Sequence, residues 1–369
     1  MKRCTKCILP ENYPGITFNE EGICNHCINY KERKYLGGDA LKMEIDSFLK
    51  TKKDRNDNYD CVLGLSGGRD SSFLLYYLVK YLNLKVLAYS VDHGFIPEQT
   101  KQNMKNMTDI LNVKLIIEEH NYLKKCIKHH ILSWLYKPSP AMIGMLCTGC
   151  RIGMDMGILN FAKNNNIPVI IMGGTPIEGA GYKFDIMKIN PNSNNITSFI
   201  LGYLFRLIIN PKWILNSTCL ITQIKEFYCH YYRKILHIRK DLLKIEPFYS
   251  YIGWKENEVI STIENELKWK KNPNTDSTWR GDCDIALLKL YLYKKTLGFN
   301  DIDDGLSSLI RDGQINREEA LERLKKEEEI PEEVIKKIFD KIGLNYSNLE
   351  IALRKTRENR NWRLTRKPE

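Results

Sequence analysis

The sequence predicts an α/β fold: a doubly wound parallel sheet, with a small cysteine-rich module before it and a helical region after it. Three observations predict this fold. Short apolar runs alternate with helical stretches between residues 59 and 173, which is typical of parallel strands joined by right-handed crossover helices. Two closely spaced cysteine pairs lie within the first 30 residues. Residues 284–350 show helical patterning with clear start signals.

The predicted elements follow in chain order. A charged helical connector is expected over 31–59. The predicted strands are 61–65, 84–92, 113–118 and 168–173, and the helices that alternate with them are 71–81, 99–111, 122–135 and 152–164. Residues 183–275 are predicted to be helical with irregular loops. Further on, Asn316 with Glu319 three residues later is a helix-capping pattern, and Pro331 marks the next helix start.

The composition excludes several classes of protein. Apolar residues make up 43% and charged residues 27% of the 369 positions, which excludes a disordered or fibrous chain. The most apolar long stretch, Ile196–Leu215, is interrupted by an arginine, an asparagine and a proline, so no membrane span is predicted. The start of the chain lacks the apolar run of a signal peptide, which predicts a cytoplasmic protein. The net charge of +11 favours an anionic partner.

The cysteine pairs at the amino terminus predict a metal site. Cys4 and Cys7 form one Cys-x-x-Cys pair, and Cys24 and Cys27 form a second pair after sixteen residues. Four thiolates on two tight turns suit tetrahedral zinc. Four protein ligands leave no open coordination position, so the predicted zinc ribbon has a structural role. The alternative is a set of reduced cysteines without metal, which the paired spacing disfavours.

A glycine-rich turn between the first strand and the first helix of the sheet is the strongest candidate for catalysis. Its residues are Leu65, Ser66, Gly67, Gly68, Arg69, Asp70, Ser71 and Ser72. Glycines let a backbone approach an anion closely, and a helix start offers unpaired N–H groups and a positive dipole end. The turn lacks the Gly-Lys-Ser/Thr ending of a Walker A loop. An ordinary strand-to-helix turn is the structural alternative.

Two other strand ends meet the same sheet edge. Val91 and Asp92 end the second predicted strand, and Gly173 and Gly174 follow the fourth. Doubly wound folds place nucleotide contacts at these carboxyl ends. Simple strand-end turns are the alternative for each of these residues.

A third cysteine set is a candidate for a second metal centre. Cys147 and Cys150 form a Cys-x-x-Cys pair directly before the helix predicted from residue 152, and Cys283 is the best remaining third ligand. A helix start is expected to lower the pKa of nearby thiols and so to favour ligation. A redox-active pair or a merely buried pair is the alternative.

Other candidates are weaker. His93 beside a strand end, the pair His129 and His130, and the aromatic-basic stretch 227–240 each have an ordinary structural interpretation. A histidine of this kind is usually structural, and we interpret the basic stretch as a solvated helix face rather than a nucleic-acid site.

The glycine-rich turn resembles, almost letter for letter, the SGGxDS loop of the PP-loop ATP pyrophosphatases. The resemblance implies a doubly wound, Rossmann-like domain that binds ATP with Mg²⁺, holds the pyrophosphate with this loop and transfers AMP to a substrate oxygen. It implies catalytic roles for Arg69, Asp70 and Ser71, with Arg69 standing where many relatives have lysine. It also places Val91 and Asp92 near the adenosine, and Gly173 and Gly174 near the phosphates or ribose.

Both ends of the chain extend this resemblance. The cysteine-rich start, Cys4 to Cys27, and the stretch from Asp304 to Leu324 are similar to the N-acetyl sugar amidotransferases of bacterial surface-polysaccharide synthesis. The resemblance implies that the chain converts a sugar acetamido group, carried on a nucleotide-activated sugar, into an acetamidino group. The expected organisation is a zinc ribbon and connector at 1–40, the PP-loop domain at 41–190, a substrate or partner region at 191–300 and a helical region at 301–369.

The source of ammonia is expected to be another protein. Residue 2 is Lys2, so the chain lacks the terminal cysteine of one glutaminase class, and a triad glutaminase motif is also missing. The resemblance implies a separate glutaminase subunit similar to those of imidazole glycerol phosphate synthase.

Two other functions stay open at this point. The three-cysteine set resembles that of PP-loop enzymes that thiolate tRNA, where it holds a [4Fe–4S] cluster with one iron open. The alternative function is therefore a sulfurtransferase acting on an amide or a tRNA base, and only this alternative implies a nucleic-acid partner. A zinc-ribbon binding module that has lost catalysis is disfavoured by the intact loop.

Overall fold

The protein is described by a computed structural model, which covers residues 1–178, 181–187, 204–235 and 241–358. Its centre is a five-stranded parallel sheet with the order β3-β2-β1-β4-β5. The strands are β1 (Cys61–Gly64), β2 (Val86–Asp92), β3 (Lys114–Glu119), β4 (Val169–Met172) and β5 (Leu243–Ile245). The predicted doubly wound α/β fold is confirmed.

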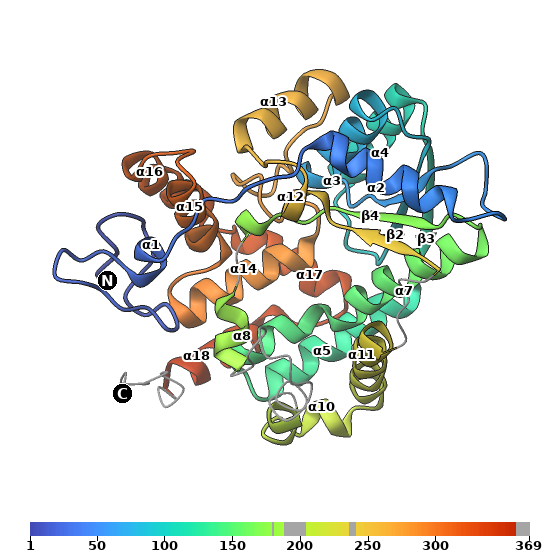
Figure 1. The fold of residues 1–369 in the computed structure, drawn as a ribbon. Coiled ribbons are helices and arrows are strands. Elements are labelled where there is room, and N and C mark those ends of the chain that lie inside the picture. Colours follow the sequence, from blue (N-terminus) through green and yellow to red (C-terminus); the bar gives the residue numbers. More distant parts are fainter. Residues whose placement is uncertain (179–180, 188–203, 236–240, 359–369) are drawn as a thin grey trace.

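Helices cover both faces of the sheet (Figure 1). One face carries α2 (Gly38–Lys50), α3 (Arg69–Tyr76), α4 (Glu98–Leu111) and α13 (Glu256–Leu267). The other carries α5 (Asn121–Tyr136), α7 (Thr148–Asn164) and α11 (Ser217–Ile235). Because both faces are covered, the central strands β1, β2 and β4 are buried almost throughout. The edge strand β3 has a half-exposed pattern instead.

The four predicted strands are present with shifts of at most two residues at their ends, and β5 is an addition. Leu243–Ile245 pairs in parallel with β4, although the sequence predicted helices and loops there. Three residues are too few for a period-2 pattern to be recognised. The predicted helix 71–81 is α3 followed by a single π-helical turn, η1 (Tyr77–Tyr81).

The carboxyl-terminal helices form a second layer beside the sheet. They are α14 (Asp284–Leu297), α15 (Asp301–Arg311), α16 (Arg317–Glu327), α17 (Glu332–Lys341) and α18 (Tyr346–Glu358). The Asn316 side chain accepts a hydrogen bond from the N–H of Glu319 at 2.8 Å, which confirms the predicted cap of α16. Pro331 immediately precedes α17, also as predicted.

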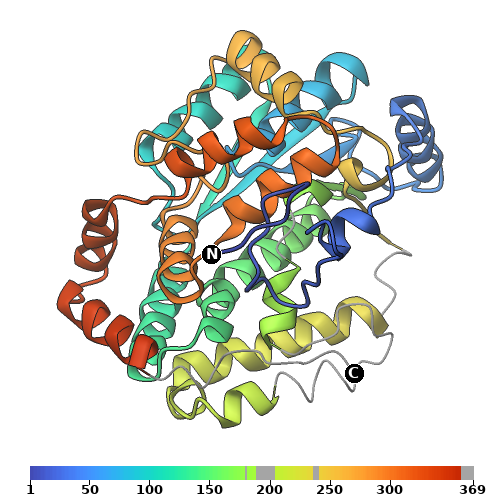
Figure 2. The ribbon, with the colours of Figure 1, turned by 90° about the vertical axis from the view of Figure 1, so that its left-hand side faces the viewer.

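The amino-terminal segment packs against α15 and α16 of the carboxyl-terminal region (Figure 2). The amino-terminal segment, with α1 (Asn25–Ile28), lies on the carboxyl-terminal helices. Arg3 pairs with Asp303 of α15 at 2.7 Å, and Arg317 donates to the carbonyl oxygens of Cys4 and Cys7. The first 30 residues have little apolar content of their own, and these contacts supply the support that they need to stay folded.

Short helices connect these layers. They are α6 (Pro140–Ile143), the 3₁₀ turns η2 (Gly144–Cys147) and η3 (Pro176–Glu178), α8 (Tyr182–Met187), α10 (Lys212–Leu215) and α12 (Pro247–Ser250). One helical stretch, Pro140–Asn164, has the length and hydropathy of a membrane span, but 56% of its apolar window is buried within the fold. Such burial is typical of a core helix. The stretch Ile196–Leu215, weighed above as a span, lies partly outside the described residues, as does the basic stretch 227–240.

Candidate functional site

The glycine-rich loop lies at the point where the sheet changes direction. From β1 the chain moves outward through β2 and β3, and then returns to the other side of β1 for β4 and β5. Parallel sheets bind ligands at such a switch point, outside the carboxyl ends of the strands. The loop follows β1 directly and leads into α3. Topology therefore places the predicted ATP loop where a nucleotide site is expected.

The backbone of the loop requires glycine. Gly67 has φ +77°, in the left-handed region, and a Cβ there would lie 2.7 Å from the Thr100 Cγ2 and 2.8 Å from the Met104 Cγ. The Gly67 carbonyl accepts a hydrogen bond from the Trp269 indole at 3.0 Å. A side chain at this position meets both backbone strain and a steric clash. The loop is thus held against α4 by close packing.

Hydroxyl groups hold the loop in one shape. Ser71 Oγ lies 3.1 Å from Ser66 Oγ and accepts from the Ser66 N–H at 3.2 Å. The hydroxyls of Ser71 and Ser72 both donate to the carbonyl of Gly68. The N-cap of α3, Gly68, supplies no side-chain cap, so the cap residue leaves the first N–H groups of the helix available to an anion. A loop of this shape is suited to binding a phosphate group.

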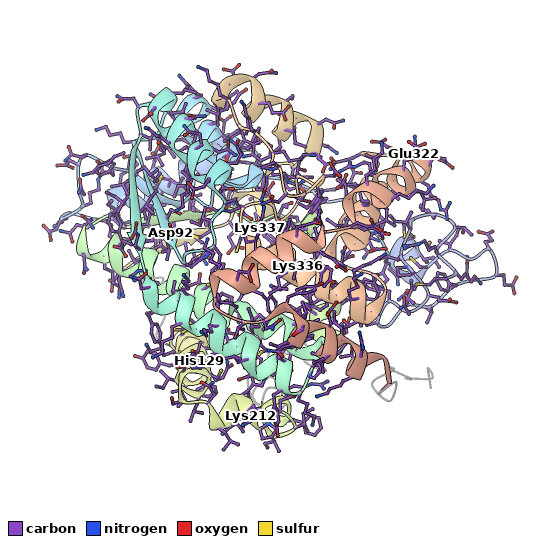
Figure 3. All side chains as sticks on the ribbon, turned by 180° about the vertical axis from the view of Figure 1, so that it is seen from behind. Asp92, His129, Lys212, Glu322, Lys336 and Lys337 are labelled. Carbon is purple, nitrogen blue, oxygen red and sulfur yellow. The ribbon has the colours of Figure 1, made fainter. Side chains whose placement is uncertain are left out.

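The other predicted strand-end residues lie at this edge. A Cβ on Gly173 would lie 3.2 Å from the N and Cα atoms of Ser71, so Gly173 is packed against the loop. Gly174 follows it, beside the ring of Tyr249. On the other side of β1, Val91 is buried and Asp92 ends β2 (Figure 3, where Asp92 is labelled). The structure brings all three predicted strand ends to one edge of the sheet.

Asp92 is fixed in its charged form. Burial works against its charge, but Lys101 lies 2.8 Å from its Oδ2 and the Gly94 N–H donates to its Oδ1 at 2.7 Å, and together they lower the pKa of Asp92. A fixed carboxylate at the end of β2 suits a ribose hydroxyl or a base amino group.

Arg69 has partners that sequence analysis did not foresee. Its guanidinium is only 3% exposed and lies between two indole rings, 4.7 Å from the ring centre of Trp254 and 3.8 Å from that of Trp279. It donates to Glu256 at 3.0 Å and also to Asp70. Its Nη1 and Nε atoms are occupied by these partners, whereas Nη2 is buried without a hydrogen-bond partner. The predicted phosphate contact of Arg69 stays a prediction.

Asp70 lies in the first turn of α3 and is almost fully buried. Trp254 donates to its Oδ1 at 2.9 Å. Burial is the largest influence and raises the pKa of Asp70 to about 6, against the opposing charge of Arg69. A carboxyl group with a pKa near neutrality is typical of a functional site.

Charged residues from a second segment reach the same edge, and sequence analysis missed them. Arg280 pairs with Glu178 at 3.3 Å and lies 3.8 Å from Asp301, and Lys183 and Tyr182 both contact Asp301. Arg280 has φ +56°, a strained conformation for arginine that is common at functional sites. The one signal in the sequence was the polar run Thr278–Asp284 between two helical stretches.

Asp282, from the same segment, lies beside the loop at Gly68. A Cβ on Gly68 would lie 3.0 Å from its Oδ2. Carboxylate oxygen is the ligand that Mg²⁺ prefers in proteins. The residues present therefore fit a nucleotide with its magnesium: backbone N–H groups for phosphate and a carboxylate for the cation.

The four amino-terminal cysteines form a cluster that is suited to holding a metal ion. Their sulfur atoms all lie within 4.8 Å of one another, and all four residues are buried. The N–H groups of Cys7 and Cys24 donate to the Cys4 sulfur at 3.4 and 3.2 Å. Hydrogen bonds from the neighbouring thiols lower the pKa of Cys7, with a smaller contribution from Arg311. A closed set of four sulfurs is suited to a structural metal ion.

The second cysteine set, Cys147, Cys150 and Cys283, is less tightly grouped than the four cysteines of the ribbon. Cys147 and Cys283 are the N-cap residues of α7 and α14, and Cys150 lies in the first turn of α7 rather than before it. Cys147 and Cys283 are close enough to Cys150 for their charges to raise its pKa. The three sulfurs do not all lie within 4.8 Å of one another, unlike those of the ribbon. The ligands of a single metal ion must lie close together in one coordination sphere. Each cysteine ligand of an iron–sulfur cluster binds a different iron atom, so such ligands can lie further apart.

One expectation about these thiols is wrong. The helix starts were expected to lower the pKa values, but burial raises the pKa of Cys283 to about 12 and that of Cys150 well above its usual value. The free-energy cost of removing a thiolate from water is larger than the stabilisation that the helix dipole gives it. In the absence of a metal these two groups are neutral thiols.

The histidine pair has structural roles. His130 is buried and stacks on Trp213 at 5.1 Å between ring centres, and the ring of His129 contacts Asn216 at 2.9 Å. Both lie in the second half of α5. Figure 3 shows the labelled His129 near Lys212 and well away from Asp92. His93 is buried at the sheet edge, where its Nδ1 accepts from the N–H of Phe95.

Comparisons with known proteins match two parts of the chain to protein families. A PP-loop domain matches residues 40–131, and a domain described as "LPS biosynthesis protein WbpG-like, C-terminal domain" matches residues 287–367. With the loop at the switch point, the first match defines the class: the chain is an ATP-using enzyme with a PP-loop domain. The two matches together support the predicted resemblance to the N-acetyl sugar amidotransferases of the PP-loop superfamily.

Among curated proteins, the uncharacterized protein MJ1599 of Methanocaldococcus jannaschii is 29% identical over 123 residues. The match covers 32% of this chain and 43% of that protein, so less than half of the relative's length is matched.

Two solved structures also align with the chain. The U34-tRNA thiolase NcsA from Methanococcus maripaludis, with its [4Fe–4S] cluster, aligns at 17% identity and a TM-score of 0.34, over 87% of this chain and 88% of the thiolase. The NH3-dependent NAD synthetase from Campylobacter jejuni aligns at 16% identity and a TM-score of 0.29, over 53% of this chain and 94% of the synthetase. Similarities of this size carry no argument about activity.

Proposed function

We propose that the protein is an ATP-dependent amidotransferase that converts the N-acetyl group of a sugar into an acetamidino group. The observation that carries this proposal is the preformed loop at the switch point, joined in one chain to the WbpG-like carboxyl-terminal domain. In this proposal the loop supplies N–H donors for the pyrophosphate of ATP, and Asp282, which lies beside Gly68, would hold Mg²⁺. The magnesium ion offsets phosphate charge.

The reaction follows in two steps. The amide oxygen of the acetamido group attacks the α-phosphorus of ATP, and pyrophosphate leaves from the loop. Ammonia then adds to the activated carbon, and AMP leaves with the former amide oxygen. The loop acts by positioning the ATP and by stabilising charge on the departing pyrophosphate.

The proposal also covers the acceptor, the source of ammonia, the metal ion of the ribbon and the location of the protein. The acceptor is a nucleotide-activated N-acetyl sugar, and the ammonia comes from a separate glutaminase subunit similar to that of imidazole glycerol phosphate synthase. The ion in the four-cysteine ribbon is Zn²⁺, which suits four thiolates. Like the enzymes of nucleotide-sugar chemistry, the protein acts in the cytoplasm.

The oxygen transfer gives the sharpest test. The purified protein is incubated with ATP, Mg²⁺, [¹⁵N]ammonium and an acetamido sugar labelled with ¹⁸O in the amide. Mass spectrometry is expected to find ¹⁸O in AMP and ¹⁵N in an amidine product. Asp70→Asn and Ser71→Ala are expected to slow both by at least about 100-fold, as for other losses of transition-state positioning. Unlabelled AMP, or an unchanged sugar, contradicts the proposal.

The proximity of Cys147 and Cys283 to Cys150 favours a second candidate, a [4Fe–4S]-dependent sulfurtransferase acting on an amide or tRNA base. Activation by ATP is the same, but sulfide replaces ammonia. Anaerobic purification with iron and sulfide assays separates the two candidates. Four irons per chain, lost in Cys147→Ser but retained in Cys61→Ser, support the sulfurtransferase.

A further inference from the structure

A cavity of about 240 Å³ lies where the two ends of the chain meet the sheet domain. Its walls come from five segments: the ribbon with Tyr13, the connector with Tyr30, the segment after β4 with Ile177, α8 with Tyr182, and α15 with Asp304. Figure 1 shows α1 and α15 side by side at this end of the molecule. The site derived above does not use these residues.

One wall is a polar stripe on α15. Asp304, Ser308 and Arg311 recur at spacings of four and three residues, so they lie on one face of the helix. Asp304 is 4% and Ser308 9% exposed, and Arg311 donates to Ser308 at 2.8 Å. Arg311 also pairs with Asp304 at 4.0 Å, so the stripe is already ordered by its own contacts. A stripe of this kind facing a cavity is suited to hydrogen bonding with a ligand.

Aromatic rings form the other walls. Tyr13 and Tyr182 pack with ring centres 5.7 Å apart, and Tyr30 lies at the connector side, where its hydroxyl donates to Asp312 at 2.6 Å. Tyrosine offers a flat apolar surface beside a polar group. A sugar ring has the complementary character, with apolar C–H faces and a rim of hydroxyls.

Size and charge narrow the class of ligand. The volume is below the range of about 300–1,000 Å³ for drug-sized ligands, so the cavity fits a single ring. Two arginines, Arg33 and Arg311, are balanced by two carboxylates, Asp185 and Asp304. Balanced charge favours an uncharged polar ligand over a phosphate or a nucleotide.

The position of the cavity connects it to the loop. Gly173, which packs against Ser71, and Ile177, which lines the cavity, belong to the same short segment after β4. The expected adenosine contacts, Val91 and Asp92, end β2 on the opposite side of β1. The cavity and the loop are therefore joined by one short segment on the β4 side of the sheet.

We propose that this cavity binds the N-acetylated sugar ring of the acceptor, with Asp304 and Arg311 bonding its hydroxyl or amide groups and the tyrosines packing on its faces. The choice of an acetamido sugar rests on the proposed function. The inference assigns a role in substrate recognition to the interface between the ribbon and α15, the two parts of the chain outside the PP-loop domain.

Saturation-transfer NMR of the full-length protein tests this site, because it detects weak sugar binding directly. The probes are N-acetylglucosamine, N-acetylgalactosamine and N-acetylmannosamine, with glucose as the reference. We expect acetamido methyl signals with the wild type. Asp304→Asn is expected to weaken binding about tenfold, the effect of losing one hydrogen bond to a charged group. Asp185→Asn, an exposed wall residue, provides a second variant where folding is not at risk.

Controls separate this inference from the proposed function. Asp340→Asn, an exposed change on α17, is expected to bind sugar as the wild type does, and ATP affinity is expected to be equal in all variants. The inference is overturned when none of the sugars binds to the wild type, or when both cavity variants bind the sugar as tightly as the wild type does. Either result overturns it even if AMP release depends on an acetamido sugar. A different result is that the wild type binds the sugar, the cavity variants do not, and no protein releases AMP. That result supports the sugar site in the cavity and contradicts only the proposed function.

Discussion

The side chain of Arg69 lies between the indole rings of Trp254 and Trp279, although its backbone belongs to the loop. Its partner Glu256 is also held by Arg323 at 2.6 Å. Burial opposes the charge of Glu256, but Arg323 and Arg69 lower its pKa, so the carboxylate stays ionised. The cluster fixes α3 to α13 and to the segment before α14, directly beneath the loop.

Arg69→Ala is expected to lower the free energy of unfolding by about 3–5 kcal/mol, the usual cost of breaking a buried ion pair from one side. Urea unfolding at pH 7 measures this change. Lys42→Ala removes one partner of the exposed pair Lys42–Asp46 and is expected to cost less than about 1 kcal/mol. Equal effects of the two variants would show that the Arg69 cluster is not a structural centre.

At the scale of single residues, sequence reasoning recognised the loop but not the contacts of its side chains. The motif identified Gly67 and Ser71 because their roles depend on local backbone geometry. The partners of Arg69 come from residues 254–279, nearly 200 positions away, and no local pattern indicates a contact over that separation. For the same reason Arg280 and Asp282 were missed.

At the scale of elements, the loop depends on glycine for two separable reasons. Gly67→Ala meets a left-handed backbone, at φ +77°, and a clash with Thr100 at 2.7 Å. Gly15→Ala meets a similar backbone, at φ +70°, with nothing within 4 Å. Thermal unfolding is expected to show a loss of about 1 kcal/mol for Gly15→Ala, and a clearly larger loss, with weaker ATP binding, for Gly67→Ala. Equal losses would mean that packing against α4 is unimportant.

The ribbon is a second element whose stability depends on contacts outside itself. Removal of its metal with a chelator is expected to lower the melting temperature of the whole protein, because the binding free energy of a structural ion is folding free energy. Cys7→Ser is expected to bind less than one zinc per chain by metal analysis and to melt at the lower temperature without chelator. Cys61→Ser, a buried cysteine in β1, serves as the control for metal content. Full zinc content in Cys7→Ser would contradict the four-cysteine centre.

Periodicity predicted the strands and helices of the sheet domain well, because each is long enough to show its pattern. The exceptions have physical reasons. β5 has only three residues, and α7 begins at Thr148, earlier than predicted, since the turn η2 leads into it continuously. Spacing alone predicted the four-cysteine cluster, whereas the cavity between the chain ends required the tertiary structure.

At the scale of the whole molecule, a charge network joins the sheet domain to the carboxyl-terminal helices. Burial disfavours the charge of Asp301, but Lys183 and then Arg280 lower its pKa to about 2, from an ordinary value of 3.8. A carboxyl group with a lowered pKa stabilises the fold above its unfolded pKa and loses that contribution as the pH falls through the folded value.

The stability of the wild type is therefore expected to fall between about pH 4 and pH 2, with Asp301 contributing about 2 kcal/mol of the change. In Asp301→Asn this contribution is missing, so the difference in stability between the two proteins is expected to be large at pH 7 and to shrink toward pH 2. Urea unfolding at a series of pH values gives this difference. A difference that is constant with pH would show that Asp301 carries no linked charge.

The central claim is that the loop from Ser66 to Ser72 binds ATP for cleavage between the α- and β-phosphates. The most direct measurement is ³¹P NMR of the products formed from ATP and Mg²⁺ with an acetamido sugar and ammonium. AMP and pyrophosphate in equal amounts are the expected products, and their formation is expected to stop in Ser71→Ala while the fold is retained. Release of ADP and phosphate, or unchanged turnover in Ser71→Ala, would contradict the account.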